Sequence, residues 1–474
     1  MVLRGKKMLF SSIEFLYYFL PIVIALYFIV PFKFKNLILL ISSLFFYFWG
    51  EPVYVILMAV MALSGYVHGL LIDKFRGTKK SKIALVSSLV VGLGALGFFK
   101  YSNFFIDNIN NLFDSAMSTL ALALPIGISF YTFQILSYTI DLYRGKYEVQ
   151  KNFIDFFTYV ALFPQLIAGP IVRYSDVDIE LKSRKHSFEN FAYGVNRFII
   201  GLSKKILIAD VLAEFCDIAK TSTNGSVLFM WAYVIAYAIH IYFDFSGYSD
   251  MAIGLGRIFG FHFPENFNYP YISKSITEFW RRWHMTLGSW FRDYVYIPLG
   301  GNRVSKLKWI RNIFVVWFLT GFWHGAGWNF IVWGLMFGIL LLIEKIFLFK
   351  YLEKIPKIFS RIYVIFFILI SWIIFDAATL TEAITRITSL FGANNLPMIT
   401  ADTLYYIRSY AVVFILGLIG CTPLIKNLVL KLKSNEKCNK IVNIIEPIVQ
   451  VSLLVLVTAY LIDGSFSAFI YFRF

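Results

Sequence analysis

Charge is scarce in this chain, because Asp, Glu, Lys and Arg together make up 15% of its 474 residues, against roughly 25% in a typical soluble domain. Hydrophobic residues make up 59% and aromatic residues 19%. This composition excludes an ordinary soluble domain. Long apolar runs recur along the whole chain with no linker or low-complexity segment between them, so we expect one polytopic, all-α membrane domain over residues 1–474.

Cysteine is also scarce, with Cys216, Cys421 and Cys438 scattered along the sequence. Their spacing shows no pairs, which argues against a disulfide framework or a metal cluster. No two histidines fall at the spacing of metal ligands and no Glu joins them, so we expect no metal site.

Acidic residues are outnumbered, which leaves a formal net charge of +16. The Lys and Arg residues lie in short loops between apolar runs, such as 33–35, 73–82 and 350–357. This placement indicates charges that set membrane topology, and we expect no nucleic-acid partner. The basic start MVLRGKK followed by an apolar stretch is typical of a signal peptide, but Pro21 interrupts the stretch and no small-residue cleavage site follows. We therefore expect a retained first helix, and we leave the orientation in the membrane open because both flanks of this helix are basic.

The apolar runs predict about eleven or twelve membrane-spanning helices, with interfacial or re-entrant helices between some of them. The polar stretches 188–214 and 247–300 would lie at the interface or re-enter, which requires backbone that is buried in protein or lines a wet cavity. The candidate spans are 12–30, 37–49, 53–72, 83–100, 119–140, 153–172, 226–245, 309–322, 326–347, 361–376, 406–424 and 446–463.

The stretch 271–303 carries a helix signature. Ser275 followed by Glu278 forms a capping box, which predicts a helix start, and Arg281 and Arg282 can pair with Glu278. An apolar stripe at steps of four, four, three and four residues predicts one amphipathic helix at headgroup level, and its members are Phe279, Trp283, Leu287, Trp290 and Tyr294. From this stretch alone, His284 at the edge of the stripe is better explained as an interfacial histidine bonded to a headgroup or a carbonyl than as a catalytic group.

His324 stands in a different context, the apolar sequence GFWHGAGWNF. An ionisable side chain inside an apolar span costs a few kcal/mol, so such residues usually face a bundle interior and have a function. Gly321 and Gly325 form a small-xxx-small pair that lets a neighbouring backbone come close. Two interpretations stay open: a hydrogen bond between helices, or a general base near neutral pH, which we favour because a dry site holds imidazole neutral.

Two further stretches are broken by Gly, Ser or Pro. Asp244 and Asp250 flank a Ser-Gly pair within 240–271, and 163–174 reads FPQLIAGPIVRY. Either stretch could be a broken helix beside a cavity or a site of tight helix packing, and periodicity does not separate the two.

Taken together, these motifs resemble a known family. The run from YFDFSGYSDMAIGLGRIFGFHFPENFNYPYISKSITEFWRRWH to IPLGGNR, followed by GFWHGAGWNFIVWG, is similar to the core of the membrane-bound O-acyltransferases, and most of all to the branch that acetylates alginate, peptidoglycan and cellulose. FFYFWGEPVYVILM, FYTFQILSYTIDLYRG and the closing FIYFRF extend the resemblance over nearly the full chain, with the family core at about 120–350. The resemblance implies a ring of tilted helices around a funnel with a tunnel through it.

The resemblance also implies roles. His324 would be the catalytic base and His284 would line the tunnel or assist. We expect Trp283, Trp323, Trp328, Asn329 and Asp250 along the tunnel, with Trp328 or Asn329 or helix-end N–H groups as candidates to meet the oxyanion. No bound cofactor is expected. The donor would be acetyl-CoA, or another acyl thioester, from the cytoplasm.

The acceptor hydroxyl would belong to an extracytoplasmic polysaccharide or to a separate extracytoplasmic acetyl-transferring partner protein. The chain would lie in the plasma (inner) membrane, in contact with lipids. D-alanyl transfer from a carrier-protein thioester to teichoic acid is the nearest alternative, and fatty acyl transfer to a lipid is a weaker one. A transporter of envelope polysaccharide precursors is the alternative from another class, although transporters often carry an internal repeat and none is visible here.

Overall fold

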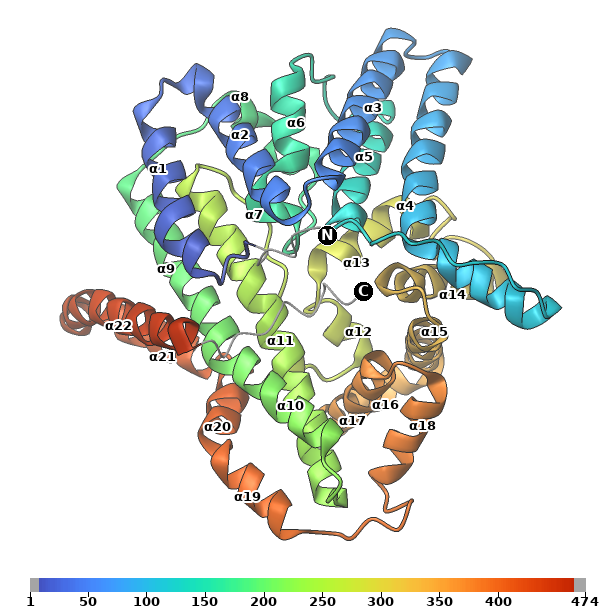
Figure 1. Ribbon diagram of the computed structural model, residues 1–474, viewed down its shortest axis with the longest axis vertical. Coiled ribbons are helices and arrows are strands. Elements are labelled where there is room, and N and C mark those ends of the chain that lie inside the picture. The colour runs from blue at the N-terminus through green and yellow to red at the C-terminus, as the bar shows by residue number, and fades with distance from the viewer. Residues whose placement is uncertain (1–7, 464–474) are drawn as a thin grey trace. The chain divides into compact units, whose positions relative to one another are not determined.

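The computed structural model describes residues 8–463, and within them all regular structure is helical (Figure 1). The closing motif FIYFRF and the basic start MVLRGKK lie outside the described residues. The chain divides into two compact units. The first holds the described residues up to Phe198 together with Asp250–Pro264, and the second holds Ile199–Ser249 together with the described residues from Glu265 onward.

Helices of the first unit are η1 (Glu14–Phe19), α1 (Leu20–Ile29), α2 (Phe32–Gly50), α3 (Tyr54–Lys74), α4 (Lys79–Phe113), α5 (Ile128–Tyr143), α6 (Phe153–Ala161), α7 (Phe163–Leu166) and α8 (Tyr174–Lys182). Two helices, α9 (Phe188–Ser203) and α11 (Val227–Ile258), contribute residues to both units.

Helices of the second unit are η2 (Lys204–Asp210), α10 (Val211–Thr221), η3 (Pro270–Ile272), α12 (Ile276–Trp280), α13 (Met285–Phe291), η4 (Arg292–Tyr296), α14 (Lys306–His324), α15 (Trp328–Ile343), η5 (Glu344–Leu348), α16 (Phe349–Leu352), α17 (Lys357–Asp376), α18 (Leu380–Ser389), α19 (Ala401–Ser409), α20 (Ala411–Gly420), α21 (Leu424–Lys433) and α22 (Glu436–Asp463).

These helices confirm an all-helical, multi-pass membrane protein, with fewer long spans than expected. Seven helices of the described residues are long and apolar enough to cross a membrane, or eight if α19 and α20, which meet at a bend of 58°, form one span. The expected span 119–140 shortens to the 16-residue α5, because 115–127 is not helical. The expected span 153–172 breaks at Leu162 into α6 and α7. Composition predicted where the chain is apolar, but not where it stops being helical.

The stretch 163–174, which Pro and Gly interrupt, forms hydrogen bonds with neighbouring parts of the protein. Ser43 Oγ accepts a hydrogen bond from the Phe163 amide at 3.0 Å, and the Tyr159 hydroxyl donates to the Val172 carbonyl at 3.2 Å. Its irregular backbone is thus buried in protein, one of the two conditions under which such backbone is tolerated at membrane depth.

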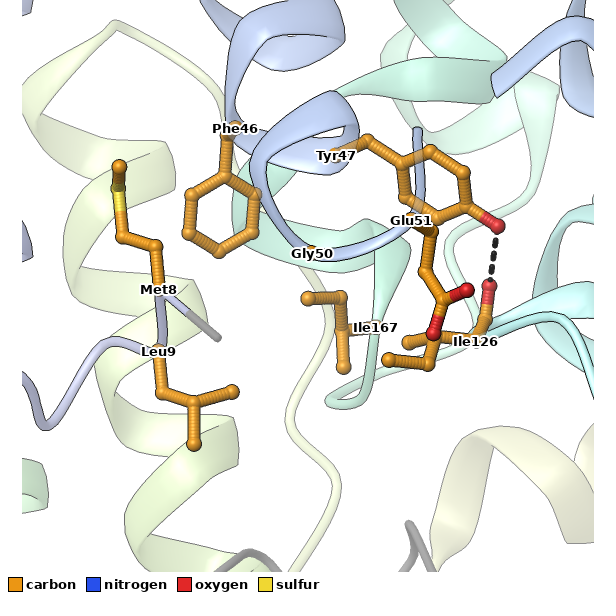
Figure 2. A pocket seen from close by; sticks show the side chains of 8 residues that line it. All are labelled: Met8, Leu9, Phe46, Tyr47, Gly50, Glu51, Ile126 and Ile167. Carbon is orange, nitrogen blue, oxygen red and sulfur yellow. Dashed lines mark hydrogen bonds between the residues drawn. The ribbon is translucent and has the colours of Figure 1, made fainter. Parts of the chain in front are cut away.

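A small hollow in the first unit lies beside this stretch, lined by Met8, Leu9, Phe46, Tyr47, Gly50, Glu51, Ile126 and Ile167. Figure 2 shows the Tyr47 hydroxyl pointing at the Ile126 carbonyl, to which it donates at 2.9 Å. Most of the lining is apolar. It lacks histidine, so the candidate chemistry lies elsewhere.

The Ser-Gly pair between Asp244 and Asp250 does not break a helix, because α11 runs continuously from Val227 to Ile258. The broken-helix alternative is therefore wrong for this stretch. Instead, the glycines admit neighbouring backbone: a Cβ on Gly247 would lie 2.7 Å from the Gly201 carbonyl oxygen, and one on Gly254 would lie 2.6 Å from the Gly194 carbonyl oxygen. Helix packing explains these glycines.

Helices α14 and α15 lie next to each other (Figure 1), and glycines let their backbones approach closely. A Cβ on Gly321 would lie 2.2 Å from the Phe330 carbonyl oxygen, and one on Gly334 would lie 2.3 Å from the Trp317 carbonyl oxygen. The expected close approach at Gly321 is confirmed. It holds the end of α14, and with it His324, against α15.

Gly321→Ala is expected to destabilise the second unit by about 1–3 kcal/mol, the usual cost of overpacking, because the added methyl meets rigid backbone. Gly338→Ala on α15 is the matched control, since its Cβ would meet the Phe314 and Trp317 side chains at an ordinary 3.4 Å. The thermal midpoint of the purified protein in detergent checks this. Equal midpoints for the two variants would contradict the interlocking of α14 and α15.

Candidate functional site

His324 is the last residue of α14, and the chain leaves the helix through extended Gly325 before α15 begins at Trp328. Its side chain is buried, with 4% exposure. Aromatic rings surround the imidazole: the centroids of Trp323 and Trp333 each lie 5.0 Å away, and that of Phe375 lies 5.4 Å away. The histidine thus occupies an aromatic pocket at a helix end.

His284 lies between α12 and α13 in the left-handed backbone region, with φ of 43°. The single amphipathic helix expected over this stretch is therefore wrong, because the chain turns at this residue. The helix start is right: Ser275 Oγ caps the Glu278 amide at 2.9 Å, and Arg282 pairs with Glu278 at 2.9 Å.

The residues of the expected stripe are all buried, at 9% exposure or less: Phe279, Trp283, Leu287, Trp290 and Tyr294. His284 itself is 2% exposed, so of the two partners expected from that stretch alone, a headgroup is excluded and a carbonyl remains. The apolar stripe is therefore covered by protein in the second unit.

Asn266 holds His284 in place and was not identified as a site residue from the sequence. Its Oδ1 accepts hydrogen bonds from His284 Nδ1 at 3.1 Å, from Thr286 Oγ1 at 2.9 Å and from the Thr286 amide at 3.3 Å. Its Nδ2 donates to Ser249 Oγ at 3.1 Å. The side chain of Asn266 therefore joins the turn that carries His284 to α11.

The backbone of Asn266 supports the same turn, because its carbonyl accepts a hydrogen bond from the Met285 amide at 3.0 Å. The hydrogen bonds of the Asn266 side chain show which ring nitrogen of His284 carries the proton. A backbone N–H can only donate, so the Asn266 atom facing Thr286 is the carbonyl oxygen, and His284 must donate to it from Nδ1. The lone pair is then on Nε2, which is buried and has no hydrogen-bond partner in the described part of the chain. Burial lowers the pKa of His284, which lies outside the candidate spans, to about 3.

The two histidines share one neighbour, Trp323. Its ring centroid lies 6.0 Å from that of His284 and 5.0 Å from that of His324. Phe245 covers His284 from another side, with centroids 4.7 Å apart and the ring planes at 89°. The structure thus brings His284, His324 and Trp323 together inside the second unit.

The other expected tunnel residues divide into two groups. Trp283 is buried and connects to the His324 pocket through one intervening ring, that of Trp372. The centroid of Trp372 lies 4.9 Å from that of Trp283 and 5.7 Å from that of Phe375. Asn329 is buried in the first turn of α15 and donates from Nδ2 to the Ala377 carbonyl at 2.9 Å, so this amide joins α15 to the end of α17.

Trp328 and Asp250 lie in different settings. Trp328 is 54% exposed at the start of α15. Asp250 belongs to the first unit, where its carboxylate pairs with Arg197 at 2.7 Å.

Asp244 also forms an ion pair, with Lys205. Lys205 Nζ lies 2.7 Å from Asp244 Oδ1 and 2.5 Å from Asp210 Oδ1, and all three side chains are buried. This cluster anchors η2 to α11. Within residues 8–463, no group of three His, Cys, Asp or Glu side chains is arranged to hold a metal ion.

Comparison with known proteins identifies related chains. Residues 146–381, which include Asn266 and both histidines, match the family model for the membrane-bound O-acyltransferase family. The probable alginate O-acetylase AlgI of Pseudomonas aeruginosa is 43% identical over 390 residues, which cover 81% of this chain and 75% of that protein. The peptidoglycan O-acetyltransferase of Helicobacter pylori is 36% identical over 84% of this chain and 82% of its own length. The teichoic acid D-alanyltransferase of Bacillus subtilis is 33% identical over 46% of this chain and 58% of its own length.

Proposed function

Because the chain belongs to the membrane-bound O-acyltransferase family, and is therefore an O-acyltransferase, we propose that it transfers an acetyl group from a cytoplasmic thioester, acetyl-CoA, to a hydroxyl group outside the cytoplasm. The acceptor is a polysaccharide hydroxyl or the hydroxyl of a separate partner transferase, and the chain works in the plasma membrane. The observation that carries this proposal is the burial of His284 and His324 around the ring of Trp323.

In the proposed reaction, His324 is the general base. Neutral imidazole removes the proton of the acceptor hydroxyl while the hydroxyl oxygen attacks the thioester carbonyl. The C–O bond forms, the C–S bond breaks, and the departing thiolate takes the proton back from His324. In this proposal, the aromatic pocket around His324 excludes water, which would otherwise compete with the acceptor for the acyl group.

His284 has a different role, set by its tautomer. Because the Nδ1–H group of His284 donates its hydrogen bond to Asn266, the Nε2 atom carries no proton and can only accept a hydrogen bond. It therefore accepts a hydrogen bond from a substrate donor other than the reacting hydroxyl, whose single proton goes to His324, and it does not stabilise the negative charge that develops on the carbonyl oxygen. The Asn329 side-chain amide already donates to the Ala377 carbonyl. We therefore assign stabilisation of that charge to backbone N–H groups in the first turn of α15, which begins at Trp328, shortly after His324.

D-alanyl transfer is the second candidate function, because a stretch covering 46% of the chain is 33% identical to a teichoic acid D-alanyltransferase. The matches to the alginate and peptidoglycan acetylating proteins cover 81% and 84% of the chain. This wider coverage favours acetate as the acyl group.

Deleting the gene and restoring it in the same host distinguishes the two functions. We expect mild base to release acetate, and not D-alanine, from envelope and secreted polymers only when the protein is present. Ester-linked D-alanine that depends on the protein, with no dependent acetate, would replace acetyl transfer by alanyl transfer.

A further inference from the structure

Two buried cations of the first unit lie around one tyrosine. Lys35, in the first turn of α2, is 8% exposed, and Arg184, just after α8, is 6% exposed. Both contact Tyr27: Arg184 Nε donates to the Tyr27 hydroxyl at 3.0 Å, and Lys35 Nζ lies 4.5 Å from the centre of its ring. In the described residues, no carboxylate forms an ion pair with either cation, and Arg184 Nη2 has no hydrogen-bond partner.

Two acids lie near this pair without forming an ion pair with it. Asp155 and Glu180 attract Arg184 electrostatically, but each is engaged by another donor. Asp155 Oδ1 accepts from the Asn36 amide at 2.6 Å, and Glu180 Oε1 accepts from His262 Nδ1 at 2.5 Å. A buried cation that lacks a directly paired carboxylate is costly, so this cluster favours an anionic ligand.

His186 lies beside these two cations, and their charges affect its pKa. His186 Nε2 lies 3.3 Å from the Tyr27 hydroxyl. Partial burial, followed by the charges of Lys35 and Arg184, lowers the pKa of His186 to about 4. It stays neutral near pH 7 and leaves the two cations as the charges of the cluster.

We propose that Lys35 and Arg184 form a binding site for a phosphate oxyanion, and that its occupant is the headgroup of an anionic phospholipid. Lys35 begins a candidate membrane span, Phe32–Gly50, which places it at one membrane face. The apolar side chains beside it are exposed: Phe28 at 41%, Phe32 at 40% and Phe34 at 44%. These rings suit the acyl chains of a lipid and not the ribose and base of a nucleotide.

Lipid titrations of the purified full-length protein in neutral detergent test the site, with bound lipid counted by native mass spectrometry. The probes are phosphatidylglycerol, phosphatidylcholine, inorganic phosphate and coenzyme A. We expect tight binding of phosphatidylglycerol alone, and affinity for it about tenfold lower in Lys35→Gln, the effect of losing one charge-assisted hydrogen bond.

Lys33→Gln is the matched control, because Lys33 is an exposed lysine in the same turn. It should change the affinity by no more than about twofold, since exposed charges contribute little. Equal losses in the two variants, or none in Lys35→Gln, would overturn the site. Binding of coenzyme A that depends on Lys35, without such binding of phosphatidylglycerol, would overturn the lipid as occupant.

A second measurement separates ligand binding from a structural role. Without lipid, Lys35→Gln removes one of two buried cations that lack a paired carboxylate, so its thermal midpoint in neutral detergent should equal or exceed that of the native protein. A lower midpoint together with unchanged lipid affinity would show that Lys35 only packs against Tyr27. Should Lys35→Gln not fold, Arg184→Gln is compared with exposed Lys185→Gln in the same way.

Discussion

Replacing His324 with alanine is expected to lower the rate of acetyl ester formation by roughly 10³-fold, within the range that general acid–base catalysis supplies. The rings of Trp323, Trp333 and Phe375, which surround the imidazole, carry no group that could take the proton in its place. His324→Gln should lose as much activity, although it keeps the polarity and most of the volume. The measurement is the initial rate of transfer from labelled acetyl-CoA in membranes that contain equal amounts of each variant.

His68→Gln is the control for this experiment. His68 is a half-buried histidine of α3 in the first unit, where it contacts the Ser64 carbonyl at 2.7 Å and Ser87 Oγ at 3.1 Å. It should keep native activity. If His324→Gln retained activity close to that of His68→Gln, His324 would be a packing residue and the proposed base would be wrong.

Replacing Asn266 with alanine is expected to lower kcat by about 10²-fold, because His284 would lose the contact that fixes its tautomer and direction, a positioning effect of the size often seen for supporting residues. The loss of its buried hydrogen bonds should also destabilise the protein by about 1–3 kcal/mol. Asn268→Ala is the matched control, since Asn268 is exposed two residues away and should change neither quantity.

Asn266→Asp separates positioning from simple structural support. The carboxylate accepts the same Nδ1–H bond but favours protonated imidazole, so it raises the pKa of His284 from about 3. Because Nε2 must be unprotonated to accept a hydrogen bond, activity should fall on the acidic side at a higher pH than in the native protein. A pH–rate profile measures this shift. An unchanged profile, with kcat reduced in the alanine variant only in proportion to lost folded protein, would reduce Asn266 to a structural residue.

The sequence predicted the features that depend on composition and on local context. A lone imidazole in an apolar run pointed to His324, and the small residue Gly321 predicted the close approach that the structure shows. The capping box at Ser275 and Glu278 predicted the start of α12 that the structure shows. These signals are local, so a single sequence carries them.

Features that depend on backbone breaks and distant contacts could not be predicted in the same way. The stripe is continuous through His284, and nothing in its period reveals a left-handed residue there. Asn266 meets His284 across 18 residues, and Arg184 meets Tyr27 across 157, distances at which residue spacing gives no guidance. The ring, funnel and tunnel implied by the family resemblance, and the single domain, stay predictions.

Transfer of the acetyl group from one side of the membrane to the other can be measured in sealed inverted membrane vesicles. Labelled acetyl-CoA is added outside such vesicles, on the former cytoplasmic face, and base-labile label is then measured on the enclosed material. We expect enclosed acetyl ester to appear with the native protein and to be lost with His324→Gln. Label that stays outside with the native protein, or enclosed label that does not depend on His324, would contradict the proposed transfer.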